Sequence, residues 1–189
     1  ANQRIVGKDY KYQQLARDFA SPWRAKRIYE LIKVNPKITM DDVSNIQRDV
    51  QSFPHQKLAT DLLNNNAASG ETLSDLRGWD GRMTANSRPA LIVNEIRNCV
   101  ANKIAEDNYP VPSFVIRERL MYRIIDQKPS RWLPSKFSSF NDLYKTCDTE
   151  SRAKLTKDYG DQANWTWGKS FKSKYPHPLS IAPLIGDRF

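Results

Sequence analysis

Side chains that could act as bases, nucleophiles or metal ligands are few in this sequence, and their spacing matches no catalytic motif. His55 follows a proline and His177 lies between two prolines, so we interpret each as a structural histidine. A Ser–His–Asp triad would require folding to bring a Ser and an acid to one of them, and no spacing favours that arrangement. The seven glycines form no phosphate-binding loop, and the motifs GxSxG and HExxH are absent.

The two cysteines, Cys99 and Cys147, are 48 positions apart. They form no CxxC pair, and because the chain has two histidines, a zinc site would need carboxylate ligands at unmarked spacing. A disulfide formed in an oxidising compartment and a pair of core thiols both fit the sequence. We expect no metal site and no cofactor.

Two acidic positions invite a catalytic interpretation, but a structural one fits them better. Asp80 lies in LRGWDGRM, residues 76–83, where an Asp-Gly step after a Trp is typical of a turn. We expect its carboxylate to accept hydrogen bonds from nearby backbone N–H groups. Arg48 and Asp49 are expected to form an ion pair with another helix.

The segment NWTWGKSFKSKYPHPL, residues 164–179, interleaves aromatic side chains with lysines. Such a segment could stack bases and contact phosphates, and the net charge of +9 favours an acidic partner such as nucleic acid. However, the 30 basic and 21 acidic residues are spread along the chain, with modest clusters at 23–27 and 168–174. We therefore interpret the segment as an edge that packs against a partner, with a basic nucleic-acid-binding module or a helical interaction module as alternatives.

The elements that must position these side chains are predicted to be mostly helical. Helical patterns cover residues 21–35, 39–53, 55–65, 72–79, 87–107, 113–127 and 139–160. Strand-like patterns occur near residues 1–7 and 164–172. The prediction is a mainly α chain, with α+β character at its ends, that forms a single unit over residues 1–189.

Several helix ends carry specific capping signals. Thr39 with Asp42 three residues later resembles a capping box, and Ser87 and Ser113 are predicted N-caps. Gly160 is predicted to end the last long helix. No apolar run reaches the roughly 18 residues that a membrane span needs.

The two ends of the chain are expected to be cut from a longer protein. The sequence begins Ala-Asn-Gln without an initiator Met, and it ends IAPLIGDRF without a polar tail. We therefore expect either a mature subunit or an excised piece.

Five segments occur in the order seen in the large β-subunit of the penicillin acylase family: ANQRIVG, SPWRAKRIYELI, TMDDVSNIQRDVQS, LRGWDGRM and WTWGKSF followed by YPHPL. The sequence thus resembles these N-terminal nucleophile amidohydrolases, which include the acyl-homoserine lactone acylases. The resemblance extends over essentially all 189 residues. It implies that the chain is the helical portion of an αββα β-subunit.

The resemblance also implies functions for individual residues. The family's nucleophile is the N-terminal Ser of the β-subunit, whose own α-amino group acts as the general base. Ala1 is not that Ser, so the nucleophile is expected upstream and this chain alone should be inactive. Asn2 matches the Asn whose amide helps to form the oxyanion hole, and Arg27 matches an Arg that orients the site, with Arg24 as its neighbouring alternative. Phe171 stands where the family often has a His.

The remaining implications concern partners and location. The parent protein would hydrolyse an acyl amide bond, such as a β-lactam side chain or an N-acyl-homoserine lactone, with a role in antibiotic metabolism. Its partners would be the α-subunit and the remainder of the β-subunit, with no nucleic acid and no membrane. The family is commonly periplasmic, a location that would permit a Cys99–Cys147 disulfide.

Overall fold

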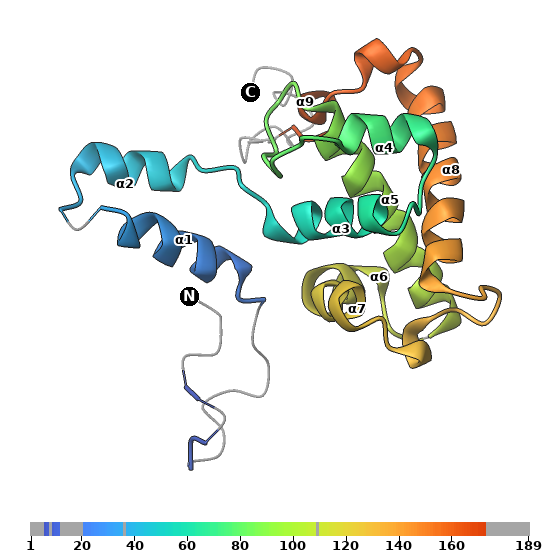
Figure 1. The fold of residues 1–189 in the computed structure, drawn as a ribbon, viewed down its shortest axis with the longest axis horizontal. Helices are drawn as coiled ribbons and strands as arrows, with labels where there is room; N and C mark the ends of the chain where they lie inside the picture. Colours follow the sequence, from blue (N-terminus) through green and yellow to red (C-terminus); the bar gives the residue numbers. More distant parts are fainter. Residues whose placement is uncertain (1–5, 8, 12–20, 36, 109, 173–189) are drawn as a thin grey trace, which may run out of the picture.

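The structure, a computed structural model, describes residues 6–7, 9–11, 21–35, 37–108 and 110–172, and its regular elements in these ranges are helices, with no named strand (Figure 1). The mainly α prediction is therefore confirmed. The α-helices are α1 (Trp23–Lys33), α2 (Met40–Gln47), α3 (Phe53–Asn64), α4 (Gly70–Leu76), α5 (Arg88–Asp107), α6 (Ser113–Val115), α7 (Met121–Gln127), α8 (Phe140–Tyr159) and α9 (Trp167–Ser170). A π-helical segment, η1 (Ile116–Leu120), joins α6 to α7, and the short 3₁₀ turns are η2 (Ser130–Trp132) and η3 (Gln162–Asn164).

Side-chain caps set many of these boundaries. The Thr39 side chain accepts from the backbone N–H of Asp42, and the Asp42 carboxylate accepts from that of Thr39, so the predicted capping box is present. Ser87 caps α5 as predicted, by accepting from Ala90 N at 3.2 Å. Gly160 ends α8 with φ of +70°, a conformation that favours glycine. The predicted cap Ser113 is instead the first residue of α6, which follows Pro112.

Helix α5 is the centre of the helical body that α3 to α9 form. It packs against α8, α3 and α4, and Figure 1 shows it crossing the body between them. The first turn of α5 is buried on all sides, from Ala90 to Val93, and from Val93 onward the buried residues recur at helical spacing along one stripe. These buried residues include Leu91, Ile92, Val93, Ile96 and Val100.

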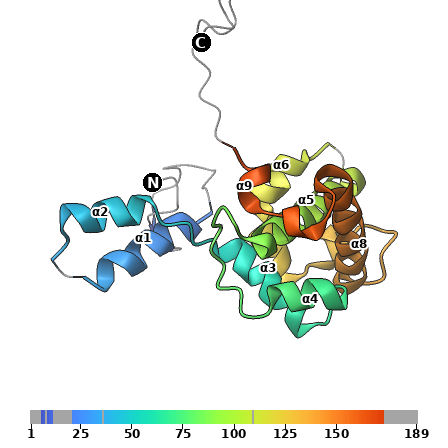
Figure 2. The ribbon, with the colours of Figure 1, turned by 90° about the horizontal axis from the view of Figure 1, so that it is seen from above.

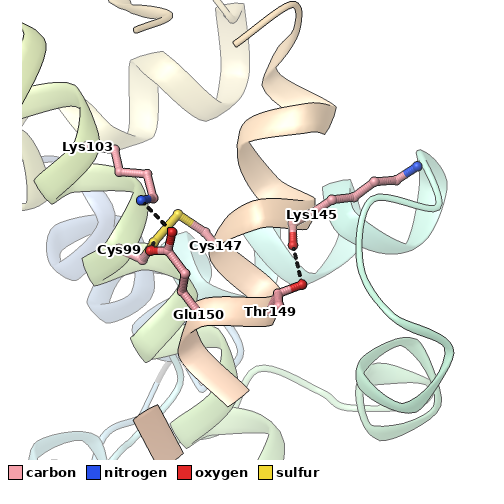
Figure 3. Close-up of a disulfide and its surroundings, with 6 residues drawn as sticks. All are labelled: Cys99, Lys103, Lys145, Cys147, Thr149 and Glu150. Atoms are coloured by element: carbon pink, nitrogen blue, oxygen red, sulfur yellow. Dashed lines mark hydrogen bonds and ion pairs between the residues drawn. A yellow bond between two sulfur atoms is a disulfide. The ribbon is translucent and has the colours of Figure 1, made fainter. Parts of the chain in front are cut away.

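A disulfide joins the two longest helices. Cys99 on α5 and Cys147 on α8 are bonded, with their Cα atoms 5.6 Å apart, and the ion pair of Lys103 and Glu150 lies beside them (Figure 3). Of the two alternatives that the sequence left open, the structure has the disulfide. A cross-link over 48 positions restricts the unfolded chain and stabilises the fold by about 4 kcal/mol in the loop-entropy account.

The strand predicted over residues 164–172 is wrong, because this segment forms η3 and α9. Trp165 is 1% exposed, and its indole N–H donates to Gly160 O at 3.1 Å. The backbone N–H of Trp167 donates to Ser87 O at 3.1 Å, which fastens the segment to the loop before α5 instead of to a strand. The rings of Trp167 and Phe171, four residues apart, stack at 5.0 Å, which is helical spacing. The other predicted strand, near residues 1–7, lies largely outside the described residues.

Helix α2 also ends earlier than predicted. It stops at Gln47, Arg48 closes its last turn, and residues 49–52 are not helical before Phe53 begins α3. The reason is pairing with a distant loop: Met83 N donates to Val50 O, and Ser52 N donates to Gly81 O, each at 2.9 Å. These bonds replace the helical ones that Val50 O and Ser52 N would otherwise make.

Helices α1 and α2 form a hairpin that projects from the helical body (Figures 1 and 2). Neither helix has a fully buried residue, and Val34 and Met40 are 80% and 82% exposed. The hairpin meets the body through Trp23, whose ring lies 6.0 Å from that of Phe53 and 6.2 Å from that of Tyr122. None of the helices in the described ranges combines the length and apolarity needed to cross a membrane.

Candidate functional site

Of the two site residues that the resemblance implies, the structure describes Arg27. Asn2 lies outside the described residues. Arg27 is in the second turn of α1, and its neighbouring alternative, Arg24, lies one turn earlier on the same helix. The candidate site is therefore built around Arg27, at the end of the hairpin that is close to the body.

Arg27 is held by a carboxylate from beyond α2. Its Nε donates to Asp49 Oδ2 at 2.6 Å, and its Nη2 donates to Asp49 Oδ1 at 3.1 Å. Arg82, from the loop between α4 and α5, places Nη1 3.4 Å from the same Oδ1. We call Arg27, Asp49 and Arg82 the arginine–aspartate cluster. A two-point contact of this kind fixes the plane of the Arg27 guanidinium as well as its position.

The Asp49 side chain is 10% exposed and both partners favour its charged form. The hydrogen bond from Arg27 lowers the pKa of the Asp49 carboxyl, and the charges of Arg27 and Arg82 act in the same direction, against the opposing effect of partial burial. The same hydrogen bond raises the pKa of the Arg27 guanidinium. Arg27 and Asp49 are therefore both charged at neutral pH.

Two cavities lie next to the cluster. One, of about 590 Å³, is open to solvent and is lined by residues of the hairpin and by Arg82. The other, of about 430 Å³, reaches from α1 to Phe53 at the start of α3. Arg27 and Asp49 line both cavities. A guanidinium that is fixed beside a cavity can orient a carbonyl, an amide or a developing negative charge.

The sequence interpretation of Asp49 as an ion-pair residue is confirmed, although it lies after α2 and not within it. Arg48 instead bonds to its own helix, through Ser44 O and Asn45 Oδ1. The sequence did not indicate that Arg82 would join the cluster, because 33 positions separate it from Asp49. Its only signal was its place in LRGWDGRM.

Asp80 serves the turn that was predicted for it. Its Oδ1 accepts from Arg82 N at 2.9 Å, and Gly81 between them has φ of +86°. The backbone carbonyl of Asp80 accepts from Gln51 Nε2 at 2.6 Å. The Asp80 turn thus fastens the loop that carries Arg82 to the segment that carries Asp49.

His55 has structural partners, in agreement with its interpretation. Its Nδ1 lies 2.6 Å from Ser52 Oγ, and its Nε2 lies 3.3 Å from Asn94 Oδ1. The sequence did not reveal this arrangement of serine, histidine and amide. Burial, and then the charge of Arg97, lowers the pKa of His55 to about 4, so its ring is a poor proton acceptor at neutral pH. The other histidine, His177, lies outside the described residues.

The aromatic segment that suggested nucleic-acid binding is partly buried. Trp165 packs inside the body with the Arg152 guanidinium 5.1 Å from its ring centre, so it has no free face for a base. Within the described residues, no group of three His, Cys, Asp or Glu side chains is arranged to hold a metal ion.

The match to a known protein family extends over both the hairpin and the body. The family model for penicillin amidase matches residues 1–189. The chain belongs to the penicillin amidase family. Penicillin acylase 2 proenzyme from Pseudomonas sp. (strain SE83) is 33% identical over 109 residues, which make up 55% of this chain and 14% of that relative.

Membership of the penicillin amidase family confirms the resemblance drawn from five sequence segments. Three of those segments meet at the arginine–aspartate cluster: Arg27 comes from SPWRAKRIYELI, Asp49 from TMDDVSNIQRDVQS and Arg82 from LRGWDGRM. Segments that are far apart in the sequence therefore converge on one charged contact.

Proposed function

We propose that this chain is part of the β-subunit of a penicillin acylase-like amidohydrolase, which hydrolyses an acyl amide bond through an acyl-enzyme. The observation that carries the proposal is the match of the penicillin amidase family model to all 189 residues. The fixed guanidinium of Arg27 beside two cavities supports it. Candidate substrates are the side-chain amide of a β-lactam, an N-acyl-homoserine lactone and related acyl amides.

In the proposed mechanism, the nucleophile is an N-terminal Ser outside this chain. Its hydroxyl oxygen attacks the amide carbonyl while its own α-amino group takes the proton. The C–N bond then breaks, the amine leaves with that proton, and water hydrolyses the acyl ester. Asn2 contributes a side-chain N–H to the oxyanion hole, and Arg27 orients the site. A donor of this kind typically contributes about 100- to 1,000-fold to the rate.

The proposal assigns this chain partners from the same precursor, namely the α-subunit and the rest of the β-subunit. Two observations support it: the name of the Pseudomonas relative describes a proenzyme, and the matched region covers 14% of that relative. We further propose a periplasmic location for the parent protein. The disulfide between α5 and α8 supports an oxidising compartment.

The test compares this chain with the full precursor on a phenylacetyl anilide and a long-chain acyl-homoserine lactone. We expect activity in the processed full-length protein and none in this chain alone. Asn2→Ala in the processed protein should lower kcat by about 100- to 1,000-fold, while the precursor still matures. A processed protein that hydrolyses neither substrate, nor any other acyl amide in a panel of varied chain lengths, would overturn the proposal.

A further inference from the structure

The residues that directly follow Asp49 are hydrogen-bonded to the loop between α4 and α5, which belongs to the helical body. Two backbone hydrogen bonds, Ser52 N to Gly81 O and Met83 N to Val50 O, join residues 50–52 to residues 81–83. Gln51 adds a side-chain bond to the Asp80 carbonyl at 2.6 Å. Asp49 therefore extends from an anchored segment toward a hairpin that has few other contacts with the body.

The Asp49 carboxylate uses both of its oxygens at this junction. Oδ2 accepts from Arg27 Nε, while Oδ1 is shared between Arg27 Nη2 and Arg82 Nη1. The third nitrogen of Arg27, Nη1, is 3.8 Å from Glu30 Oε2 on the same helix. Asp49 thus binds one edge of the Arg27 guanidinium, so that Nη1 lies on the opposite side from the carboxylate.

We propose that Asp49 is a positioning residue, which holds Arg27 in the orientation that the amidase reaction requires. The inference rests on the proposed function for the role of Arg27, and adds a residue to it. Arg82 shares the carboxylate and ties its position to the body, so that the loop between α4 and α5 contributes to the placement of Arg27.

Asp49 fixes the orientation of the Arg27 guanidinium and does not merely stabilise the fold through an ion pair. Without its charge, Arg27 and Arg82 would lose the group that they share, and Arg27 would be free to adopt other rotamers. Small displacements of an orienting group can cost about 100-fold in rate without weakening substrate binding. The effect should therefore appear in kcat more than in KM.

The experiment uses the full-length processed enzyme with four variants: Asp49→Asn, Arg27→Gln, the double variant and Asp75→Asn. Asp75 is the matched control, because it is a buried carboxylate that pairs with two arginines, Arg88 and Arg152, but lies on α4 and lines neither cavity beside Arg27. For each variant, kcat, KM, autoprocessing and Tm are measured.

We expect Asp49→Asn to lower kcat by about 10- to 100-fold with little change in KM. The double variant should be no slower than Arg27→Gln, because both changes remove one orientation and their effects should not multiply. Asp75→Asn should keep a kcat near that of the wild type, even if its Tm falls. Should Asp49→Asn fail to mature, Asp49→Glu replaces it, since it keeps the charge but moves the carboxylate, and kcat should still fall at constant KM.

Losses that multiply in the double variant would overturn the inference. An equal kcat loss in Asp49→Asn and Asp75→Asn, at an equal loss of Tm, would also overturn it, because destabilisation alone would then explain the effect. An active wild-type enzyme whose kcat is unchanged by either Asp49 substitution would overturn the role of Asp49 alone. A processed wild-type enzyme without acyl amidase activity would overturn the proposed function, and this inference with it.

Discussion

At the scale of single residues, His55 shows how hydrogen-bond partners select a protonation state. Ser52 Oγ can donate to Nδ1, and Nε2 can donate to Asn94 Oδ1, an arrangement that suits the neutral ring. Burial disfavours the charged ring, and the guanidinium of Arg97 adds to the effect. His55 therefore gives the fold a specific sensitivity to acid.

His55 should make the fold less stable as the pH falls from 6.5 to about 4. In this range the unfolded chain binds a proton at His55 and the folded chain does not, so the stabilisation is complete above 6.5 and is lost on acidification. The free energy of unfolding of the wild type, minus that of His55→Gln, should fall by about 3 kcal/mol between pH 7.5 and 4. Urea unfolding at several pH values measures it. A difference that is independent of pH would contradict the assignment.

At the scale of elements, the pairing of residues 50–52 with residues 81–83 depends on the Asp80 turn. A Cβ atom at Gly81 would lie 2.7 Å from both Gln51 Nε2 and Gln56 Cβ, and φ is +86°. Gly78 has a similar φ of +74° but no heavy atom within 4 Å of such a Cβ. Comparing an alanine substitution at Gly78 with one at Gly81 therefore distinguishes the free-energy cost of backbone strain from that of steric crowding.

Gly81→Ala should destabilise the fold by about 2–4 kcal/mol, because backbone strain and steric crowding both act at this position. Gly78→Ala should cost only about 1–2 kcal/mol, since the strain acts alone. Thermal or urea unfolding of this chain measures both. Equal losses for the two variants would show that crowding at Gly81 relaxes without cost, and that the Asp80 turn tolerates a side chain.

The helices were largely predictable from sequence because their signals are local. Ser87 with Pro89 at the start of α5, and Gly160 at the end of α8, act within one turn of the chain. The segment 164–172 was not predictable in this way. Its pattern suits a strand, but burial of Trp165 and bonds to the Ser87 loop decide its conformation. The end of α2 was missed for the same reason, since its competing partners are about 30 positions away.

The candidate site was predictable in its parts but not in its assembly. Arg27 came from the resemblance, and the ion-pairing of Asp49 came from the sequence pattern. Their pairing with each other, and with Arg82, depends on the extended segment that replaces the end of α2. Because no local rule predicted that segment, the sequence could not bring these three residues together.

At the scale of the whole molecule, stability is unevenly distributed. The body has a continuous core around α5, whereas the hairpin has exposed apolar side chains and no buried residue in either helix. Elements with few buried apolar contacts open at low free energy. Under the proposed function, the remainder of the precursor would cover the exposed apolar residues of the hairpin.

Amide hydrogens in α1 and α2 should exchange at least about 100-fold faster than those in α5 when this chain is studied alone. Hydrogen exchange measured by mass spectrometry tests this directly. The same peptides in the full-length protein provide the control and should be more strongly protected. Equal protection of α2 and α5 in the isolated chain would contradict this uneven distribution of stability.

The disulfide between α5 and α8 also changes the topology of the chain. Together with the backbone from Cys99 to Cys147, it closes a covalent ring that contains α6 and α7 but not the hairpin. One backbone cut within the ring would leave a single covalent molecule until the disulfide is reduced. One cut between α1 and α2 would instead sever α1, with Arg27, from Asp49. Proteolysis would therefore act very differently on two regions that are both parts of one polypeptide: the ring would survive as a connected unit, whereas the arginine–aspartate cluster would depend on an uncut hairpin.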